Sequence, residues 1–261
     1  MDTRKKFEES IVSTTTVDNI NGYVRDYRHN VLEYVNTDDY ENDLMSGSGS
    51  ELKSKFNAIY SSSACVVNNF TPIKQNFTKI EFLGYTNFTH CSFERKMDTG
   101  LKGTPPNLDF CLESNEAIIG VESKYLEVLR TKEAKFTDSY FNNEMINAEF
   151  HILIEKYKGI SGYLDTAQLI KHALGLSRYS EKNSKKAILL YIYWQPLNHV
   201  KFQEYDLHQN ELNCFIKDIG SLSSVTFKTK TYEEFWKEYI NNPIIGSNIR
   251  LAKERYEKQI D

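Results

Sequence analysis

The stretch Ala187–Trp194 constrains the fold more than any other part of the chain. It reads Ala-Ile-Leu-Leu-Tyr-Ile-Tyr-Trp, without a polar interruption. A strand that has one face in water alternates polar and apolar residues, whereas a strand buried on both faces is continuously apolar. The run is far too short to cross a bilayer. It therefore predicts a strand inside a sheet that is covered on both faces.

A β-hairpin is expected in the middle of the chain. Asn107–Leu112 and Ala117–Lys124 have the apolar character of strands, and Glu113–Glu116 between them suits a turn. A further strand-like run lies within Phe82–Met97, where polar and apolar residues alternate loosely. Three strands are thus predicted ahead of the central one.

Helical periodicity separates the hairpin from the central strand. Apolar residues follow a helical stripe within Phe141–Tyr157, including Met145, and a second helix is predicted from Asp165–Thr166 to about Gly175. After the central strand we expect helices at 200–218, 231–240 and 247–260, and a strand at 224–230. This order predicts an α/β fold, a mixed central β-sheet flanked by α-helices with extra helices at both termini.

The first fifty residues are predicted to be a peripheral helical segment with a linker. Helices are expected at 1–12 and 20–35, and the acidic, then Gly/Ser-rich stretch Asn36–Ser50 suggests a linker or mobile loop. A helix is predicted from Glu51 to Phe70, stopping at Pro72. The predicted division is therefore 1–50 peripheral, 51–240 core and 241–261 a C-terminal helix.

Charge and cysteine content bound the function only loosely. A net charge of −4 argues against a chain coated in positive charge, but a nucleic-acid enzyme needs only a local basic surface. The four cysteines show no spacing typical of zinc sites, which favours reduced thiols. The charged start leads into no apolar segment of signal-peptide length. We expect a cytoplasmic protein without membrane association.

Two carboxylates on the predicted hairpin suggest a site for a metal ion. The turn is centred near Asn115, which places Asp109 opposite position 121 or 122, so Asp109 and Glu122 could reach one ion. Mg²⁺ prefers oxygen ligands and keeps several waters, so two carboxylates suffice as anchors. The hairpin thus predicts a site for a hard cation that could aim water at a phosphodiester.

The triplet Glu122-Ser123-Lys124 fits the same chemistry. Along a strand Glu122 and Lys124 share one face, while the backbone carbonyl of Ser123 could complete the metal shell. A lysine among carboxylates stays protonated, which favours orienting water over general-base work. A Glu-x-Lys triplet is also common on solvated strands, but here its neighbours are apolar, and charges in apolar surroundings are costly unless paired.

Five segments together resemble the PD-(D/E)xK, or restriction-endonuclease-like, superfamily, in particular a group of uncharacterised bacterial members. They are Ser61–Ala64 with Asn68–Phe70, Thr104–Asp109, Val121–Glu127, Phe136–Tyr140, and Tyr163–Leu176 followed by Tyr193–Gln195. The first motif reads Pro-Asn-Leu-Asp instead of Pro-Asp, so the proline is offset by three residues. The resemblance leaves out the first and last fifty residues.

The resemblance implies a restriction-endonuclease-like core and a set of catalytic residues. Asp109 and Glu122 would bind Mg²⁺, for which Mn²⁺ would substitute, and Lys124 would activate water. Gln168 stands where members often place a Gln or charged residue on the following helix. The additional acidic residue of many members would be Glu94, with Glu51 as the weaker candidate.

Basic residues near these motifs are candidates for contacts with nucleic acid. Lys96 and Lys102 flank Gly100 in a predicted loop, Lys171 shares a helical face with Gln168, and Arg178 belongs to a basic cluster in a predicted loop after that helix. Each could equally be an ordinary solvated residue. His172 is expected to be a partly exposed imidazole, with a catalytic role as the less favoured alternative.

The function predicted from the sequence is a Mg²⁺-dependent nuclease, in the first place an endonuclease acting on DNA. The alternatives are a catalytically silent nucleic-acid-binding or assembly module with the same fold, and a nuclease acting on RNA. The modest basic content favours a homodimer or a partner subunit that supplies part of the grip on the substrate.

Overall fold

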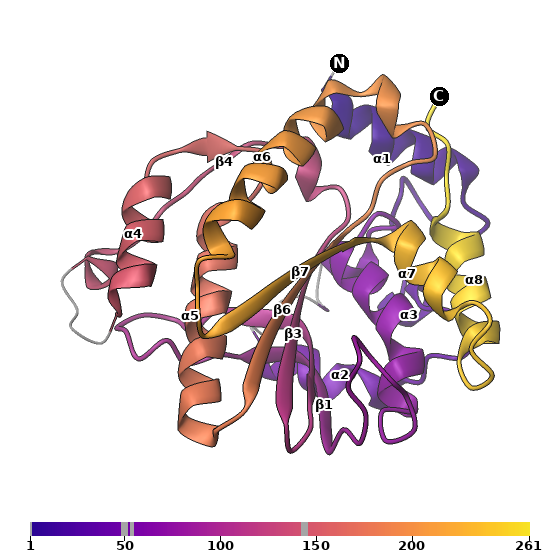
Figure 1. The fold of residues 1–261 in the computed structure, drawn as a ribbon. Helices are drawn as coiled ribbons and strands as arrows, with labels where there is room; N and C mark the ends of the chain where they lie inside the picture. Colours follow the sequence, from indigo (N-terminus) through magenta and orange to yellow (C-terminus); the bar gives the residue numbers. More distant parts are fainter. Residues whose placement is uncertain (1, 48–51, 53–54, 142–145) are drawn as a thin grey trace.

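The computed structural model describes residues 2–47, 52, 55–141 and 146–261, and its centre is a five-stranded sheet (Figure 1). The strands lie in the order β1-β2-β3-β6-β7, with bounds His90–Lys96, Asn107–Glu113, Ala117–Lys124, Lys186–Tyr193 and Val225–Thr231. The first three are antiparallel, whereas β6 and β7 run parallel to β3. The sheet is therefore mixed, as predicted, and seven of the eight residues of β6 are buried.

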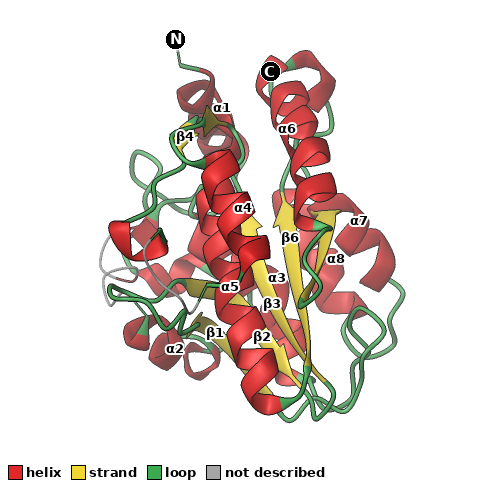
Figure 2. Cartoon of the chain, turned by 60° about the vertical axis from the view of Figure 1, so that its left-hand side comes forward, coloured by secondary structure: helices red, strands yellow, loops and turns green. Residues whose placement is uncertain are grey.

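Helices cover both faces of this sheet (Figure 2). On one face α5 (Thr166–Asn183) contacts β3, β6 and β7, and α4 (Ala148–Tyr157) packs outside it. On the other face α3 (Ser62–Gln75) contacts β1, β2 and β3. The other helices are α1 (Thr3–Thr14), α2 (Glu41–Ser46), α6 (Gln203–Ile219), α7 (Tyr232–Tyr239) and α8 (Gly246–Tyr256), and β4 (Lys132–Glu133) pairs with β5 (Ser161–Gly162). None of the helices described here is long and apolar enough to span a membrane.

Helix α3 differs from the prediction at both ends. It begins after Ser61, whose side chain accepts a hydrogen bond from the Ala64 amide, and it continues through Pro72 to Gln75. Pro72 has no N–H to donate to the carbonyl of Asn68, and the Tyr34 hydroxyl donates to that carbonyl instead. The acceptor freed by the proline is thereby satisfied. Glu51, the predicted start, lies outside the described residues.

The helix predicted at 20–35 is wrong. Asn21 and Gly22 both have positive φ, 53° and 86°, and Ile20 and Tyr23 exchange backbone hydrogen bonds of 2.8 and 3.1 Å. Positive φ at both central residues defines the tight turn that Asn-Gly favours. A short helix, α2, occupies part of the predicted linker because it buries Leu44; Ser48–Ser50 lie outside the described residues.

Two helices also have other bounds than predicted. Helix α4 begins at Ala148 instead of Phe141, while Met145 lies outside the described residues. Helix α5 continues past Gly175 to Asn183, so Arg178 lies on a helix and not in a loop. Gly175 serves close packing, because a Cβ at that position would lie 2.7 Å from Cβ of Met97. The glycine thus marks a close approach and not a helix end.

Candidate functional site

Three carboxylates lie side by side on the strands β1, β2 and β3. Glu94 and Asp109 are flanked by the pairs Phe93–Phe110 and Arg95–Leu108, and the pair Phe110–Val121 brings Asp109 next to Glu122. The Ser123 amide donates a 2.6 Å hydrogen bond to Oδ2 of Asp109. The hairpin register therefore places Asp109 beside Glu122, as the position of the turn indicated.

Glu94 occupies a strained position in the middle of β1. Its φ of 49° is rare for a residue with a side chain, and it accepts a 3.1 Å hydrogen bond from Asn107 Nδ2. A Cβ at Gly47, just after α2, would lie 2.9 Å from Oε2 of Glu94. Strain of this kind persists only where the surroundings fix it, and it is frequent at functional sites.

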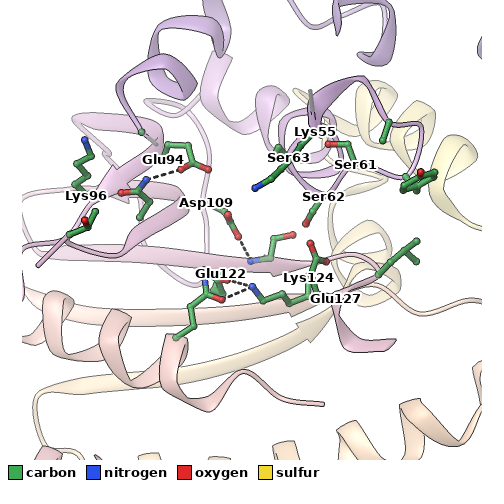
Figure 3. A pocket seen from close by; sticks show the side chains of 18 of the residues that line it. Lys55, Ser61, Ser62, Ser63, Glu94, Lys96, Asp109, Glu122, Lys124 and Glu127 are labelled. Carbon is green, nitrogen blue, oxygen red and sulfur yellow. Dashed lines mark hydrogen bonds and ion pairs between the residues drawn. The ribbon is translucent and has the colours of Figure 1, made fainter. Parts of the chain in front are cut away.

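Lys124 is the last residue of β3, and its side chain is hydrogen-bonded to the first turn of α5 (Figure 3). Its Nζ donates to Oε1 of Glu122 at 2.5 Å and to Oε1 of Gln168 at 2.8 Å. Gln168 lies in the first turn of α5, where the Asp165 side chain accepts its amide hydrogen at 3.1 Å. Ser123 points to the opposite face, with Oγ 2.7 Å from the Tyr232 hydroxyl. The cap of α5 thus holds Gln168 against the lysine.

The charges of these groups shift one another's pKa values in opposite directions. Burial, followed by the negative charge of Glu122, raises the pKa of Asp109 well above its usual value. Burial would also raise the pKa of Glu122, but Lys124 and the neighbouring His172 outweigh it and lower that pKa to about 2. Burial would lower the pKa of Lys124, yet the two carboxylates raise it. Lys124 and Glu122 are therefore both charged at neutral pH.

His172 is fully buried beside Glu122, so its expected partial exposure is wrong. Its Nε2 lies 2.8 Å from Oε2 of Glu122, but the groups are not aligned for a hydrogen bond, and neither atom has another partner among the described residues. Gln168 and His172 are four residues apart on α5 and hence share a helical face. That spacing is the signal by which the sequence could have joined His172 to the site.

One wall of a cavity of about 690 Å³ is lined by Glu94, Asp109, Glu122, Lys124 and Gln168, but not by His172. The opposite wall comes from the first sixty-three residues and includes Arg4, Tyr23, Lys55 and Tyr60 with the serines Ser61–Ser63. Figure 3 shows these serines across from Glu122 and Lys124, with Asp109 between them. Residues that were expected to be peripheral thus line the site. Glu127, near Lys124, also lines it and was not among the predicted residues.

Asn30 joins the wall formed by the N-terminal residues, here called the second wall, to helix α8. Its Nδ2 donates to the carbonyls of Phe56 and Ala58 at 2.6 and 2.7 Å, and its Oδ1 accepts from Arg255 of α8 at 2.5 Å. Asn30 is completely buried, where unsatisfied polar groups are costly. The wall is therefore a fixed part of the fold.

The four residues predicted to contact nucleic acid have different positions. Lys96 is exposed and lines the cavity, whereas Lys102 is exposed in the loop before β2. Lys171 donates to the Lys135 carbonyl at 2.7 Å and lies over two aromatic rings. The guanidinium of Arg178 packs against Gly100, where a Cβ would lie 2.3 Å from Cζ. Lys171 and Arg178 thus hold neighbouring loops in place.

The oxygen atoms at the site fit a hard divalent cation. Within the described ranges no group of three or more His, Cys, Asp and Glu side chains could hold a metal. Mg²⁺, however, needs only one or two carboxylates besides water, and the neighbouring residues Asp109 and Glu122 both line the cavity. Asp109, Glu122 and the Ser123 carbonyl remain the predicted ligands.

Comparison with known proteins gives one match. The sequence model of a family described as Restriction Endonuclease associating with ARP matches residues 8–257. No curated protein and no solved structure gave a significant match. The matched range includes the β1–β3 row of carboxylates and most of the N-terminal wall, among it Tyr23, which lies in the first fifty residues that the resemblance had left out.

Proposed function

Because the chain belongs to the restriction endonuclease family associating with ARP, we propose that it is a Mg²⁺-dependent nuclease that cuts DNA internally. One observation carries the proposal: Lys124 is buried between Glu122 and Gln168, next to Asp109, at the wall of a cavity of about 690 Å³. Burying these charges is costly unless they serve one another or a ligand. A restriction-endonuclease-like fold with this site supports phosphodiester hydrolysis.

Asp109, Glu122 and the Ser123 carbonyl would hold the ion, with Mn²⁺ as a substitute. A divalent ion there would polarise a phosphoryl oxygen and lower the pKa of a water molecule. Lys124 keeps its proton, and two of its three N–H groups are directed to Glu122 and Gln168. The third would orient the attacking water or stabilise charge on the phosphate while the ester oxygen leaves. Glu94 would support Asp109 across β1 and β2.

A partner would complete the grip on the substrate. The family is described as associating with ARP, and the chain carries a net charge of −4. Nucleic-acid affinity depends on local positive charge, and two of the predicted basic residues are engaged in holding loops. A partner subunit that supplies further basic surface, or a second copy of the chain, would meet this need.

Cleavage of plasmid and single-stranded DNA, with Mg²⁺ or Mn²⁺ and with a chelator, tests the proposal. We expect nicking or linearisation of closed circles that requires the metal and is absent in Asp109→Asn. Closed circles report internal cuts, because they have no ends. Metal-independent cutting, or equal cutting by the variant, would reject the site. If no substrate is cut but DNA is bound, the silent binding module replaces the nuclease.

His172→Ala should weaken binding of Mn²⁺ about 10-fold, since residues that orient a metal ligand typically contribute 10–100-fold to affinity. The imidazole Nε2 lies 2.8 Å from Oε2 of Glu122 and packs against that side of the carboxylate. Calorimetric titration of the full chain measures the affinity. His172→Gln keeps a polar side chain in contact with Glu122 and should lose less, and His151→Ala on α4 is the remote control. Unchanged affinity in folded His172→Ala would show that the imidazole does not orient Glu122.

A further inference from the structure

Tyr23 is held rigidly at the edge of the cavity. Its backbone is paired with Ile20 across the turn. The residues on either side of it bond to the segment 57–59: Val24 N donates to Asn57 O and Ile59 N donates to Gly22 O, both at 2.9 Å. The backbone of Tyr23 is thus fixed on both sides. Its side chain nevertheless stays 46% exposed and lines the cavity.

A second tyrosine supports the first. The ring centroids of Tyr23 and Tyr60 are 6.2 Å apart with an interplanar angle of 72°, and their hydroxyls lie 3.2 Å apart. This edge-to-face contact is a favourable arrangement of aromatic rings. It fixes the Tyr23 ring while its exposed surface remains available. Such a preordered aromatic surface is what proteins use to stack the bases of single strands.

The rest of the cavity suits the other parts of a nucleotide. The cationic residues of the same wall are Lys55 and Arg4, whose Nε pairs with Glu8 at 2.9 Å, and the opposite wall has Asp109, Glu122 and Lys124. The volume of about 690 Å³ falls in the range of pockets that enclose small ligands. Within an uninterrupted duplex the base faces are covered by their neighbours, so an aromatic ring reaches a base only where the stack is open.

We infer that the cavity takes an unpaired nucleotide of a DNA strand, with the base stacked on Tyr23 and the phosphate directed to Asp109, Glu122 and Lys124. This inference rests on the proposed nuclease function and adds its substrate class: single strands, gaps and frayed regions. An uninterrupted duplex would have to open before it could be cut.

The chain contains a matched control for Tyr23. Phe82 and Tyr85 exchange backbone hydrogen bonds of 2.9 and 3.0 Å around Leu83 and Gly84, whose φ values are 54° and 87°. This turn repeats the one before Tyr23, and Tyr85 does not belong to the described lining of the cavity. Tyr85→Ala therefore removes the same side chain from the same kind of turn at a remote place.

Binding of a labelled single-stranded oligodeoxynucleotide to the full chain in chelator, followed by fluorescence anisotropy, tests the inference. We expect tighter binding of the single strand than of a blunt duplex, and about 10-fold weaker single-strand binding by Tyr23→Ala. Tyr23→Phe and Tyr85→Ala should bind as the wild type does. In Tyr23→Trp the single strand should quench the fluorescence of the new indole. The native Trp194 and Trp236 are buried, so their fluorescence should stay constant and serve as the background.

Three outcomes would overturn the inference: equal affinity for blunt duplex, unchanged binding by Tyr23→Ala, or dependence on Tyr23 with an RNA strand alone. Cleavage with Mg²⁺ is scored separately, so the two proposals can fail independently. Binding of single strands that depends on Tyr23, without cleavage in either metal, would remove the nuclease and keep the unpaired-nucleotide site. Cleavage of duplex DNA at the same rate by wild type and Tyr23→Ala would keep the nuclease and remove the unpaired-nucleotide site.

Discussion

Lys124→Ala should lower the rate of DNA cleavage by about 10²–10³-fold, the usual cost of removing one donor that stabilises developing charge. It should also destabilise the fold by about 3 kcal/mol, because removing one partner of a buried ion pair leaves the other unpaired. Glu122 is completely buried and Lys124 nearly so. Plasmid cleavage and chemical denaturation measure the two effects.

Two further variants separate activity from stability at Lys124. The double variant Glu122→Gln/Lys124→Met removes both charges, so it should recover much of the lost stability while remaining inactive. Lys156→Ala breaks an exposed pair with Asp218 and should change stability by less than about 1 kcal/mol. Wild-type cleavage by Lys124→Ala would exclude the lysine from the reaction.

Asp109→Asn should abolish cleavage yet stabilise the protein at neutral and alkaline pH, by about 1 kcal/mol or 2–4 °C in Tm. The pKa of Asp109 is raised in the folded chain. The folded wild type therefore loses stability as pH rises through that pKa, because it must give up a proton that it holds more tightly than the unfolded chain does. The Asn variant has no such loss, so the difference in Tm should widen with increasing pH.

Glu122→Gln should destabilise the protein at neutral pH, which is the opposite of the effect expected for Asp109→Asn. The pKa of Glu122 is lowered from 4.5 to about 2, so its charge stabilises the fold above pH 4.5 and this contribution disappears as pH falls toward 2. Melting curves from acid to alkaline pH distinguish the two variants. Added Mg²⁺ should raise the Tm of the wild type but not that of Asp109→Asn. A lower Tm for Asp109→Asn at high pH would contradict the assigned direction.

The carboxylate half of the site could be predicted because local sequence determines it. A short turn between two strands fixes the register that places Asp109 beside Glu122, and strand alternation puts Lys124 on the face of Glu122. The start of α5 follows from its capping residue Asp165, which places Gln168 in the first turn. The catalytic roles of these residues, and of Glu94, stay predictions.

The N-terminal wall could not be predicted, because distant contacts determine it. The Asn-Gly pair before Tyr23 signals a turn, but nothing local indicates that this turn pairs with residue 58. The burial of His172 depends on where α5 crosses β3. Pro72 is an apparent helix stop until Tyr34 supplies the missing hydrogen-bond donor. At His172 and Pro72 tertiary packing overrode a local signal, whereas the helix expected at 20–35 overlooked the local turn signal of Asn21-Gly22.

The hydrogen bonds of Asn30 also make one half of the site depend on long-range contacts and leave the other half local. The strands with the three carboxylates leave the ribosome as one continuous hairpin unit, and contacts of short sequence separation form early. The wall with Tyr23 is bonded through Asn30 to Arg255, and Asn68 of α3 is bonded to Tyr256, so its last hydrogen bonds form only with α8. The second wall thus depends on residues about two hundred positions away in the sequence, whereas the carboxylates depend on neighbouring strands.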